Sequence, residues 1–208
     1  MCSSDLDLGD VGFGVEAQTN RLNFSSIPSL AFQRTSELGA MWDRSFVLGL
    51  DSRVIEIMKV IQPDIESLGM VNAESTNQRF AMVRANGCPK PLPLRSFGDG
   101  LNRLFGIALS LVSAKDGLLL IDEFENGLHH TVQTDIWRAI FRMARDLSVQ
   151  VFATSHSWDA IEAFQTAASE SPEDGVLVRL TRRDGKLFTT VFDEDDLETV
   201  TRENIEVR

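Results

Sequence analysis

The second half of the chain alternates short apolar runs with amphipathic stretches. Leu118–Ile121 and Val149–Ala153 are almost wholly apolar and predict buried strands, and residues from about His130 to Arg145 place their apolar side chains on one helical face between them. Two further helices are expected from about Gly100 to Ser113 and from Trp158 to about Ala168. Apolar strands joined through an amphipathic helix are typical of a parallel sheet covered on both faces, so the sequence predicts an α/β fold.

The first half of the chain has a weaker pattern. Residues 1–50 mix small polar residues with short apolar clusters and predict only weak strands or turns. A short amphipathic helix is expected next, with Asp51 or Ser52 as its cap. Two strands, a turn and a stiff proline-rich connector are then expected over residues 65–71, 78–84, 86–87 and 89–93.

The end of the chain changes pattern again. Val176–Thr181 and Leu187–Phe192 flank Asp184 and Gly185, a pair that favours the two-residue turn of a β-hairpin. A short acidic helix is expected to follow. Its acidic start, Asp193–Asp196, is better explained by favourable charge at a helix N-terminus than by metal binding.

Composition narrows the classes of function. The chain has 208 residues and a net charge of −11, which argues against a surface built to neutralise a long stretch of nucleic acid or an anionic membrane. No apolar run approaches the roughly 18 residues of a membrane span, and the N-terminus has no signal-peptide pattern, so we predict a cytoplasmic protein without a membrane partner. Cys2 and Cys88 are too few for a disulfide framework.

The strongest chemical signal is a pair of carboxylates, Asp122 and Glu123, directly after the strand Leu118–Ile121. The carboxyl end of a parallel strand opens on the ligand crevice of an α/β sheet. There an aspartate can hold a water-coordinated Mg²⁺, and a glutamate can orient or deprotonate a water molecule. This arrangement resembles the Walker B element of P-loop nucleotidases, and the second carboxylate resembles that of the ABC-type ATPases.

Three more segments resemble motifs of ABC-type ATPases, in the same order and spacing. Arg95–Gly100 precedes a helix and resembles the signature, where Ser96 could cap the helix and glycines let backbone N–H groups approach an anion. Phe124–His129 resembles the D-loop, and Thr154–His156 resembles the segment that carries the switch histidine. With Trp42–Arg44 and the chain's last residues, the similarity extends over about residues 36–208 to bacterial AAA-type ATP-binding proteins, a class related to chromosome-organising, DNA-repair and phage-defence ATPases.

The resemblance implies a role for each of these residues. Asp122 would position Mg²⁺, Glu123 would act on the attacking water, and His156 would contact the γ-phosphate of ATP. The signature would reach ATP bound by the partner protomer, and the D-loop would lie at the dimer interface; these residues are Ser96, Gly98 and Gly100, and Asn126, Gly127 and Leu128. The complete protein is therefore expected to be a homodimeric ATPase, with ATP binding as its switch. Whether DNA or a defence or repair protein is its partner stays open.

One element of the ABC-type pattern is missing, because no lysine of the chain lies in the phosphate-binding context G-x-x-x-x-G-K-[ST]. We therefore expect residues 93–208 to be the C-terminal half of an ATPase and residues 1–92 to be the remainder of its lobe or an insertion, with the phosphate loop upstream. The isolated chain is expected to be inactive. Its four lysines are Lys59, Lys90, Lys115 and Lys186.

Two alternatives remain at the level of the sequence. A degenerate ATPase could use these surfaces only for interaction, which the missing lysine favours and the intact Glu123 and His156 disfavour. A metal-dependent nuclease could place His129, His130 and nearby carboxylates around a metal ion. The side chains of Trp137 and Phe141 are expected in the core, because they lie at helical spacing.

Overall fold

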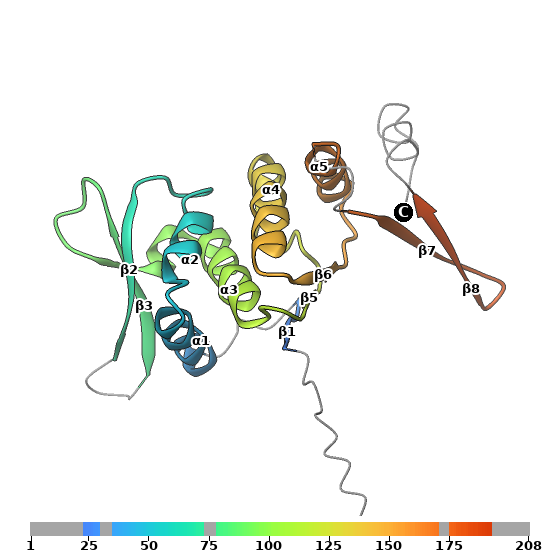
Figure 1. The fold of residues 1–208 in the computed structure, drawn as a ribbon. Helices are drawn as coiled ribbons and strands as arrows, with labels where there is room; N and C mark the ends of the chain where they lie inside the picture. Colours follow the sequence, from blue (N-terminus) through green and yellow to red (C-terminus); the bar gives the residue numbers. More distant parts are fainter. Residues whose placement is uncertain (1–22, 30–34, 73–77, 171–174, 193–208) are drawn as a thin grey trace, which may run out of the picture.

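A computed structural model describes residues 23–29, 35–72, 78–170 and 175–192. Within these residues the strands form three separate sheets, in the orders β1-β5-β6, β2-β3-β4 and β7-β8. The helices lie between the antiparallel β2-β3-β4 sheet and the β7-β8 hairpin, which projects from the opposite side of the molecule (Figure 1). The acidic helix expected after Phe192 lies outside the described residues.

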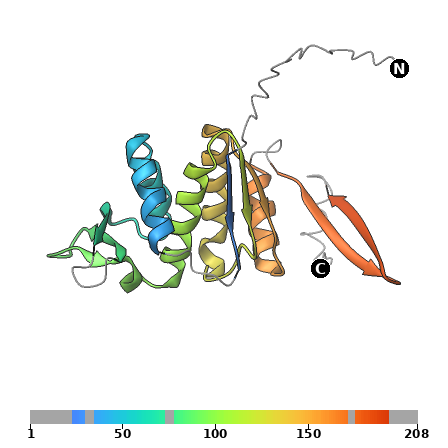
Figure 2. The ribbon, with the colours of Figure 1, turned by 90° about the horizontal axis from the view of Figure 1, so that it is seen from below.

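The sheet that carries the candidate chemistry is parallel, as the sequence predicts. Its central strand β5 (Leu118–Ile121) pairs with β1 (Phe24–Ile27) on one side and with β6 (Gln150–Ala153) on the other. Figure 2 shows the three strands side by side with helices behind them. All three strands therefore end at the same edge of the sheet.

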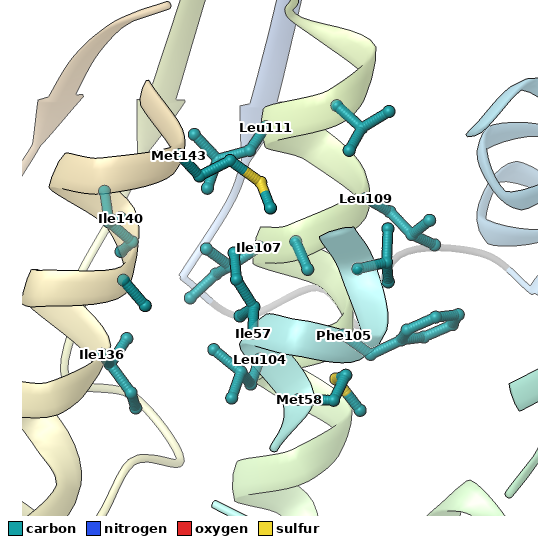
Figure 3. Close-up of a cluster of buried hydrophobic side chains, with 14 of the residues drawn as sticks. Ile57, Met58, Leu104, Phe105, Ile107, Leu109, Leu111, Ile136, Ile140 and Met143 are labelled. Carbon is teal, nitrogen blue, oxygen red and sulfur yellow. The ribbon is translucent and has the colours of Figure 1, made fainter. Parts of the chain in front are cut away.

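The helix α3 (Asp99–Ser113) lies at the centre of the fold. It contacts α1 (Thr35–Val47), α2 (Asp51–Met58), β1 and β5, and so nearly all of its side chains beyond the first turn are buried. The helix α4 (His130–Asp146) contacts α2 and packs against α5 (Trp158–Ala168). Figure 3 shows buried hydrophobic side chains of α2, α3 and α4 in one cluster.

Two helical predictions need correction. The segment 35–47 forms α1 where only weak strands or turns are expected, because its helical face is completed by contacts with α3 rather than by local pattern. The N-cap of α2 is Leu50, with no side-chain cap hydrogen bond, so neither Asp51 nor Ser52 caps the helix. Asp51 instead lies in the first helical turn, where its negative charge is favourable.

The antiparallel elements follow the predicted pattern closely. β2 (Ile65–Asn72) pairs with β3 (Arg79–Ala85), and the proline-rich connector supplies β4 (Leu92–Pro93) beside β3. β7 (Leu177–Arg183) and β8 (Lys186–Phe192) form the hairpin. Its turn residues Asp184 and Gly185 have φ values of 49° and 76°, as a type I′ turn requires.

The predicted packing of the α4 aromatic residues is confirmed: Trp137 lies in the core, and Phe141 packs against it, partly buried. The Trp137 ring stacks on that of Phe124, the residue that follows the carboxylate pair, with ring centroids 4.0 Å apart. Phe141 lies 6.0 Å from Trp137 in the same cluster. These contacts bury the root of the loop after β5 and so help to fix where it leaves the sheet.

Candidate functional site

The three strand ends of the parallel sheet are joined by backbone hydrogen bonds beyond the strands themselves. The Asp122 N–H donates to the carbonyl of Ile27 at 2.9 Å, and the Thr154 N–H donates to the carbonyl of Ile121 at 2.9 Å. The Phe124 N–H donates in turn to the Thr154 carbonyl. The segments that carry Asp122, Glu123 and His156 therefore lie side by side at one edge of the sheet.

Asp122 is an exposed carboxylate held in its ionised form. The Thr154 hydroxyl donates to Asp122 Oδ1 at 2.7 Å. That hydrogen bond, above all, lowers the pKa of Asp122 below its ordinary value, and Ser29 and the positive charge of Arg103 act in the same direction. An exposed, ionised carboxylate is the kind of oxygen ligand that Mg²⁺ accepts in proteins.

Glu123 occupies an unusual backbone conformation. Its φ of 48° lies in the left-handed region, which costs a residue with a side chain about 1–2 kcal/mol. The conformation is fixed locally, because the Glu123 N–H donates to Thr154 Oγ1 at 2.9 Å and Asn126 Nδ2 donates to Glu123 Oε2 at 2.6 Å. Thr154 thus bridges both members of the carboxylate pair.

The segment expected to be the D-loop is a tight, anchored turn. Asn126 Nδ2 also donates to the carbonyl of Ser29 after β1, at 3.1 Å, so one amide ties Glu123 to the neighbouring strand end. Gly127 has a φ of 74°, a value that glycine adopts without strain. Leu128 is buried, and its carbonyl accepts a hydrogen bond from Gln133 of α4 at 3.0 Å.

His156 lies in the link from β6 to α5. Its backbone N–H donates to Glu125 Oε1 at 2.9 Å, while its side chain is exposed. The other carboxylate oxygen of Glu125 is buried. The loop after β5 therefore also fixes the backbone of the loop after β6, and the imidazole of His156 is displayed at the same edge as the carboxylates.

The segment expected to be the signature begins differently from the prediction. The residues Leu94–Phe97 form a 3₁₀ turn, η1, and the N-cap of α3 is Gly98, with no side-chain cap hydrogen bond. Ser96 is exposed in that turn and does not cap the helix, because the turn closes before α3 starts. Gly98 has φ 94° and ψ 169°, and a Cβ there would meet no atom within 4 Å. Its backbone is open to close approach by a ligand.

Gly100 lies against the turn after β5 in the same chain. A Cβ on Gly100 would lie 3.0 Å from the carbonyl oxygen of Gly127, and a Cβ on Gly127 would lie 3.8 Å from the Asp99 carbonyl. The two glycines therefore allow the first turn of α3 to touch the predicted D-loop. The structure brings the signature segment and the carboxylate segment together through this contact.

Sequence reasoning assigned no role to Arg103, and it placed Thr154 and Glu125 in motif segments without showing that they hold this edge together. Arg103 extends from α3 and donates to backbone carbonyls of both neighbouring strand ends. A signal for it exists, because Arg103 is the single basic residue between Arg95 and Lys115, at the start of a long apolar run. Thr154 and Glu125 carry no such signal, since their roles depend on which strand ends become neighbours.

The metal-cluster alternative finds no support in the described residues. They contain no group of three or more His, Cys, Asp or Glu side chains placed to hold a metal ion. His129 is the N-cap of α4 and accepts a hydrogen bond from the Thr131 N–H, and its ring lies 4.3 Å from that of His130. The two histidines therefore form the start of α4, and these contacts explain their positions without a metal ion.

Comparison with known proteins agrees with the geometry. A family model described as "AAA domain, putative AbiEii toxin, Type IV TA system" matches residues 51–161, more than half of the chain. The chain belongs to this family of AAA ATPases, which share the P-loop fold. The match includes the signature segment, the carboxylate pair and the histidine after β6.

Two curated relatives each match a little under half of this chain. A Helicobacter pylori "ATP/GTP phosphatase" is 28% identical over 99 residues, which are 46% of this chain and 26% of that protein. An uncharacterized protein of Methanocaldococcus jannaschii is 34% identical over 90 residues, 43% of this chain and 77% of that protein. The chain therefore spans about a quarter of the H. pylori relative.

Solved structures of SMC ATPase heads share the fold. A structure described under "ATP-driven dimerization and DNA stimulated activation of SMC ATPases" superposes with a TM-score of 0.54 over 81% of this chain and 99% of that chain, at 12% identity. The Smc head domain of Pyrococcus furiosus, bound to the C-terminal domain of ScpA, gives 0.51 over 83% and 41%, also at 12% identity. In the described part of the chain, no helix is long and apolar enough to cross a membrane.

Proposed function

We propose that the chain is the part of an ATP-hydrolysing protein that carries the carboxylates, the switch histidine and the signature. Asp122 would hold the water shell of Mg²⁺, Glu123 would orient and deprotonate the attacking water, and His156 would contact the γ-phosphate. Mg²⁺, when bound, supplies charge neutralisation at the phosphates. The observation that carries this proposal is the shared edge at which the loops after β5 and β6 are hydrogen-bonded to each other.

The residues present suit the Mg²⁺ ion and one anion site, but they do not include a loop that holds the β- and γ-phosphates. Ionised, exposed Asp122 suits a hydrated metal, and the open backbone at Gly98 suits an anion at a helix N-terminus. The sequence has no phosphate-cradling loop with its lysine. The proposal therefore requires a further lobe that supplies this loop, and the division into residues 1–92 and 93–208 remains part of it.

The exposed face of the parallel sheet supports such a lobe. Phe24 is 59% exposed, Leu120 38% and Phe152 55%, and these side chains lie on the face opposite to the helices. Parallel sheets are normally covered on both faces. An apolar layer that carries the phosphate loop would cover this face next to the strand ends, which is where the loop is needed.

A dimer completes the proposal. Ser96, Gly98 and Gly100 would meet the nucleotide bound by a second protomer, and Asn126, Gly127 and Leu128 would lie at the interface. Splitting the site between two chains makes hydrolysis depend on dimerisation, because phosphoryl transfer requires all the positioning groups at once. ATP would then act as the switch.

The decisive experiment replaces Glu123 in the longer protein that supplies the phosphate loop. Glu123→Gln is expected to keep ATP binding and to lower kcat by about two to four orders of magnitude, the scale of a lost general base. Glu162→Gln, an exposed position on α5, is the matched control and should leave kcat unchanged. Full turnover in Glu123→Gln would exclude Glu123 from the reaction.

A second measurement tests the need for another lobe. Calorimetry on the 208-residue chain alone should detect no micromolar ATP binding, because the backbone cradle and lysine for the β- and γ-phosphates are missing. Micromolar affinity would contradict the proposal. If the longer protein binds ATP but never hydrolyses it, the non-catalytic interaction module becomes the better description.

The assignment of the signature to the partner's nucleotide has its own test. Ser96→Arg should abolish hydrolysis in the longer protein while leaving ATP binding to the monomer nearly intact, because a bulky cation would block the approach of the second protomer. Mixing it with a phosphate-loop mutant gives heterodimers with one intact site. Partial return of activity supports the assignment, and its absence in proven heterodimers contradicts it.

A further inference from the structure

Arg103 joins the central helix to both neighbouring strand ends of the candidate site. From the second turn of α3, Nη1 donates to the Pro28 carbonyl at 3.0 Å, and Nη2 donates to the carbonyls of Asp122 at 2.8 Å and Glu123 at 3.2 Å. Pro28 follows β1 and the other two residues follow β5. The half-buried guanidinium of Arg103 therefore hydrogen-bonds three backbone carbonyls at the sheet edge where the carboxylates lie.

The choice of partners is informative, because arginine at a protein surface commonly pairs with carboxylates. Arg138 does so here, where it bonds both Asp135 and Glu170 at the exposed α4–α5 surface. Arg103 instead donates to carbonyl oxygens, although Asp122, Glu123 and Glu125 attract its charge. Burial lowers the pKa of Arg103, and these carboxylates oppose that effect. Arg103 thus fixes the backbone, while Thr154 and Asn126 hold the Asp122 and Glu123 carboxylates.

The backbone that Arg103 holds is the strained one. The left-handed conformation of Glu123 persists only if its surroundings over-determine it. Thr154 Oγ1 holds the N–H of this residue, and Arg103 Nη2 and the Asn126 N–H hold its carbonyl. Arg103 is the member of this set that belongs to α3, the helix whose start carries the predicted signature.

We propose that Arg103 is a positioning residue that transmits the position of α3 to Glu123. This inference rests on the proposed function, in which Gly98 at the start of α3 meets the partner's nucleotide. Gly98 and Arg103 lie on one rigid helix, little more than one turn apart. When the partner's nucleotide engages Gly98, a shift of α3 would therefore change the position of Glu123, the general base of the same chain, through Arg103. The two sites of the dimer would be linked in this way.

The first test uses the 208-residue chain and needs no nucleotide. In Arg103→Met, amide hydrogen exchange in residues 121–129 should quicken by about tenfold or more, because the loop loses the bonds that fix it. Exchange in β2 and β3 should not change. Arg142→Met, an exposed position on α4, is the matched control. Equal quickening throughout the chain, or none in residues 121–129, overturns the proposal.

The second test measures turnover in the longer protein. Arg103→Met should lower kcat by about 10- to 100-fold, the cost of a small misplacement of a catalytic group, with the KM for ATP within about twofold. Arg103→Lys keeps the charge but cannot span three carbonyls, so its kcat should be intermediate. If Arg103→Met does not fold, Arg103→Lys replaces it in both the exchange and the turnover measurements. A kcat of Arg103→Lys equal to that of the unsubstituted protein overturns the proposal.

Glu123→Gln, measured in parallel in the longer protein, distinguishes a failure of the proposed function from a failure of the role proposed for Arg103. If Glu123→Gln loses turnover and the Arg103 variants keep it, the proposed function stands and the role of Arg103 is wrong. If Glu123→Gln keeps full turnover, the proposed function itself fails. A loss in both, with kcat rather than KM affected, supports the link between α3 and the general base.

Discussion

The two faces of the parallel sheet differ sharply in burial, although adjacent residues of the same strands form them. Leu119 is fully buried beneath the helices, while Leu120, the next residue of β5, is 38% exposed on the opposite face. Phe24 and Phe152 accompany Leu120 on the exposed face. The run Leu118–Ile121 has no polar alternation, so its composition belongs to a strand covered on both faces. The exposed face is where the proposed function places the further layer that carries the phosphate loop.

The comparison also shows what the covered face does for the site. Behind it, α3 packs on β1 and β5, and Arg103 and Gly100 of its first two turns touch the loops that leave the strands. The exposed face has no such contacts in the described part of the chain. The acidic edge is therefore fixed from one side, and we expect substitutions on the two faces to have unequal effects.

The largest difference is expected between two adjacent leucines of the isolated chain. Leu119→Ala should lower the free energy of unfolding by about 3–4 kcal/mol, because it leaves a cavity under α3. Leu120→Ala should cost less than about 1 kcal/mol, since that side chain is already partly in water. Urea unfolding followed by circular dichroism measures both. Equal costs would show that the two faces are equally covered in solution.

The same Leu120→Ala substitution sharpens the comparison in the longer protein that the proposed function requires. If a second lobe covers this face, the cost should rise to about 2–3 kcal/mol, the usual value for a buried leucine. Leu187→Ala, at the exposed tip of the β7-β8 hairpin, is the control and should cost the same in both proteins. An unchanged cost for Leu120→Ala would place the lobe elsewhere.

A smaller effect is expected where α3 meets the loop after β5. Gly100→Ala should destabilise the chain by about 1 kcal/mol, because its methyl group would press on the Gly127 carbonyl. Gly69→Ala in β2 is the matched control, since a Cβ there would meet nothing within 4 Å. Thermal unfolding of the two variants compares them. Stabilisation by Gly100→Ala would mean that the first turn of α3 stands away from the loop.

The smallest effect concerns the proton affinity of Asp122. Thr154→Val should raise the pKa of Asp122, because it removes the hydrogen bond that most favours the ionised carboxylate. The unsubstituted chain gains stability from this bond above the ordinary pKa of an aspartate, about 3.9, and loses it as the pH falls through the lowered value. The part of the stability difference that comes from this bond should therefore be present at neutral pH and vanish in acid, whereas the part that comes from the lost bond to the Glu123 N–H should not depend on pH.

NMR titration of the Asp122 carboxyl carbon measures that pKa directly. Thr166→Val, whose hydroxyl bonds a backbone carbonyl within α5, should leave the pKa of Asp122 unchanged. A pKa of Asp122 that is the same with and without Thr154 would show that another group holds the carboxylate ionised.

Much of the fold could be read from local pattern. The strands β5 and β6, the helices α3, α4 and α5 and the β7-β8 turn were predictable within a residue or two, because each has its own hydrophobic period or turn chemistry. The helix α1 was not, since its burial depends on α3, a distant part of the sequence. Ser96 was expected to cap α3, but a local 3₁₀ turn intervenes and the N-cap is Gly98.

By itself, the sequence determined which residues could do chemistry: a carboxylate pair closing an apolar strand, a histidine closing the next, and glycines where a backbone must be approached closely. These are properties of residue type and spacing, so they need no structure. Only the tertiary structure decided that Thr154 bridges Asp122 and Glu123, that Arg103 holds the backbone of both, and that the described residues cover only one face of the sheet. The physical reason is that hydrogen bonds between strand ends, and the burial of a face, depend on segments far apart in the chain becoming neighbours.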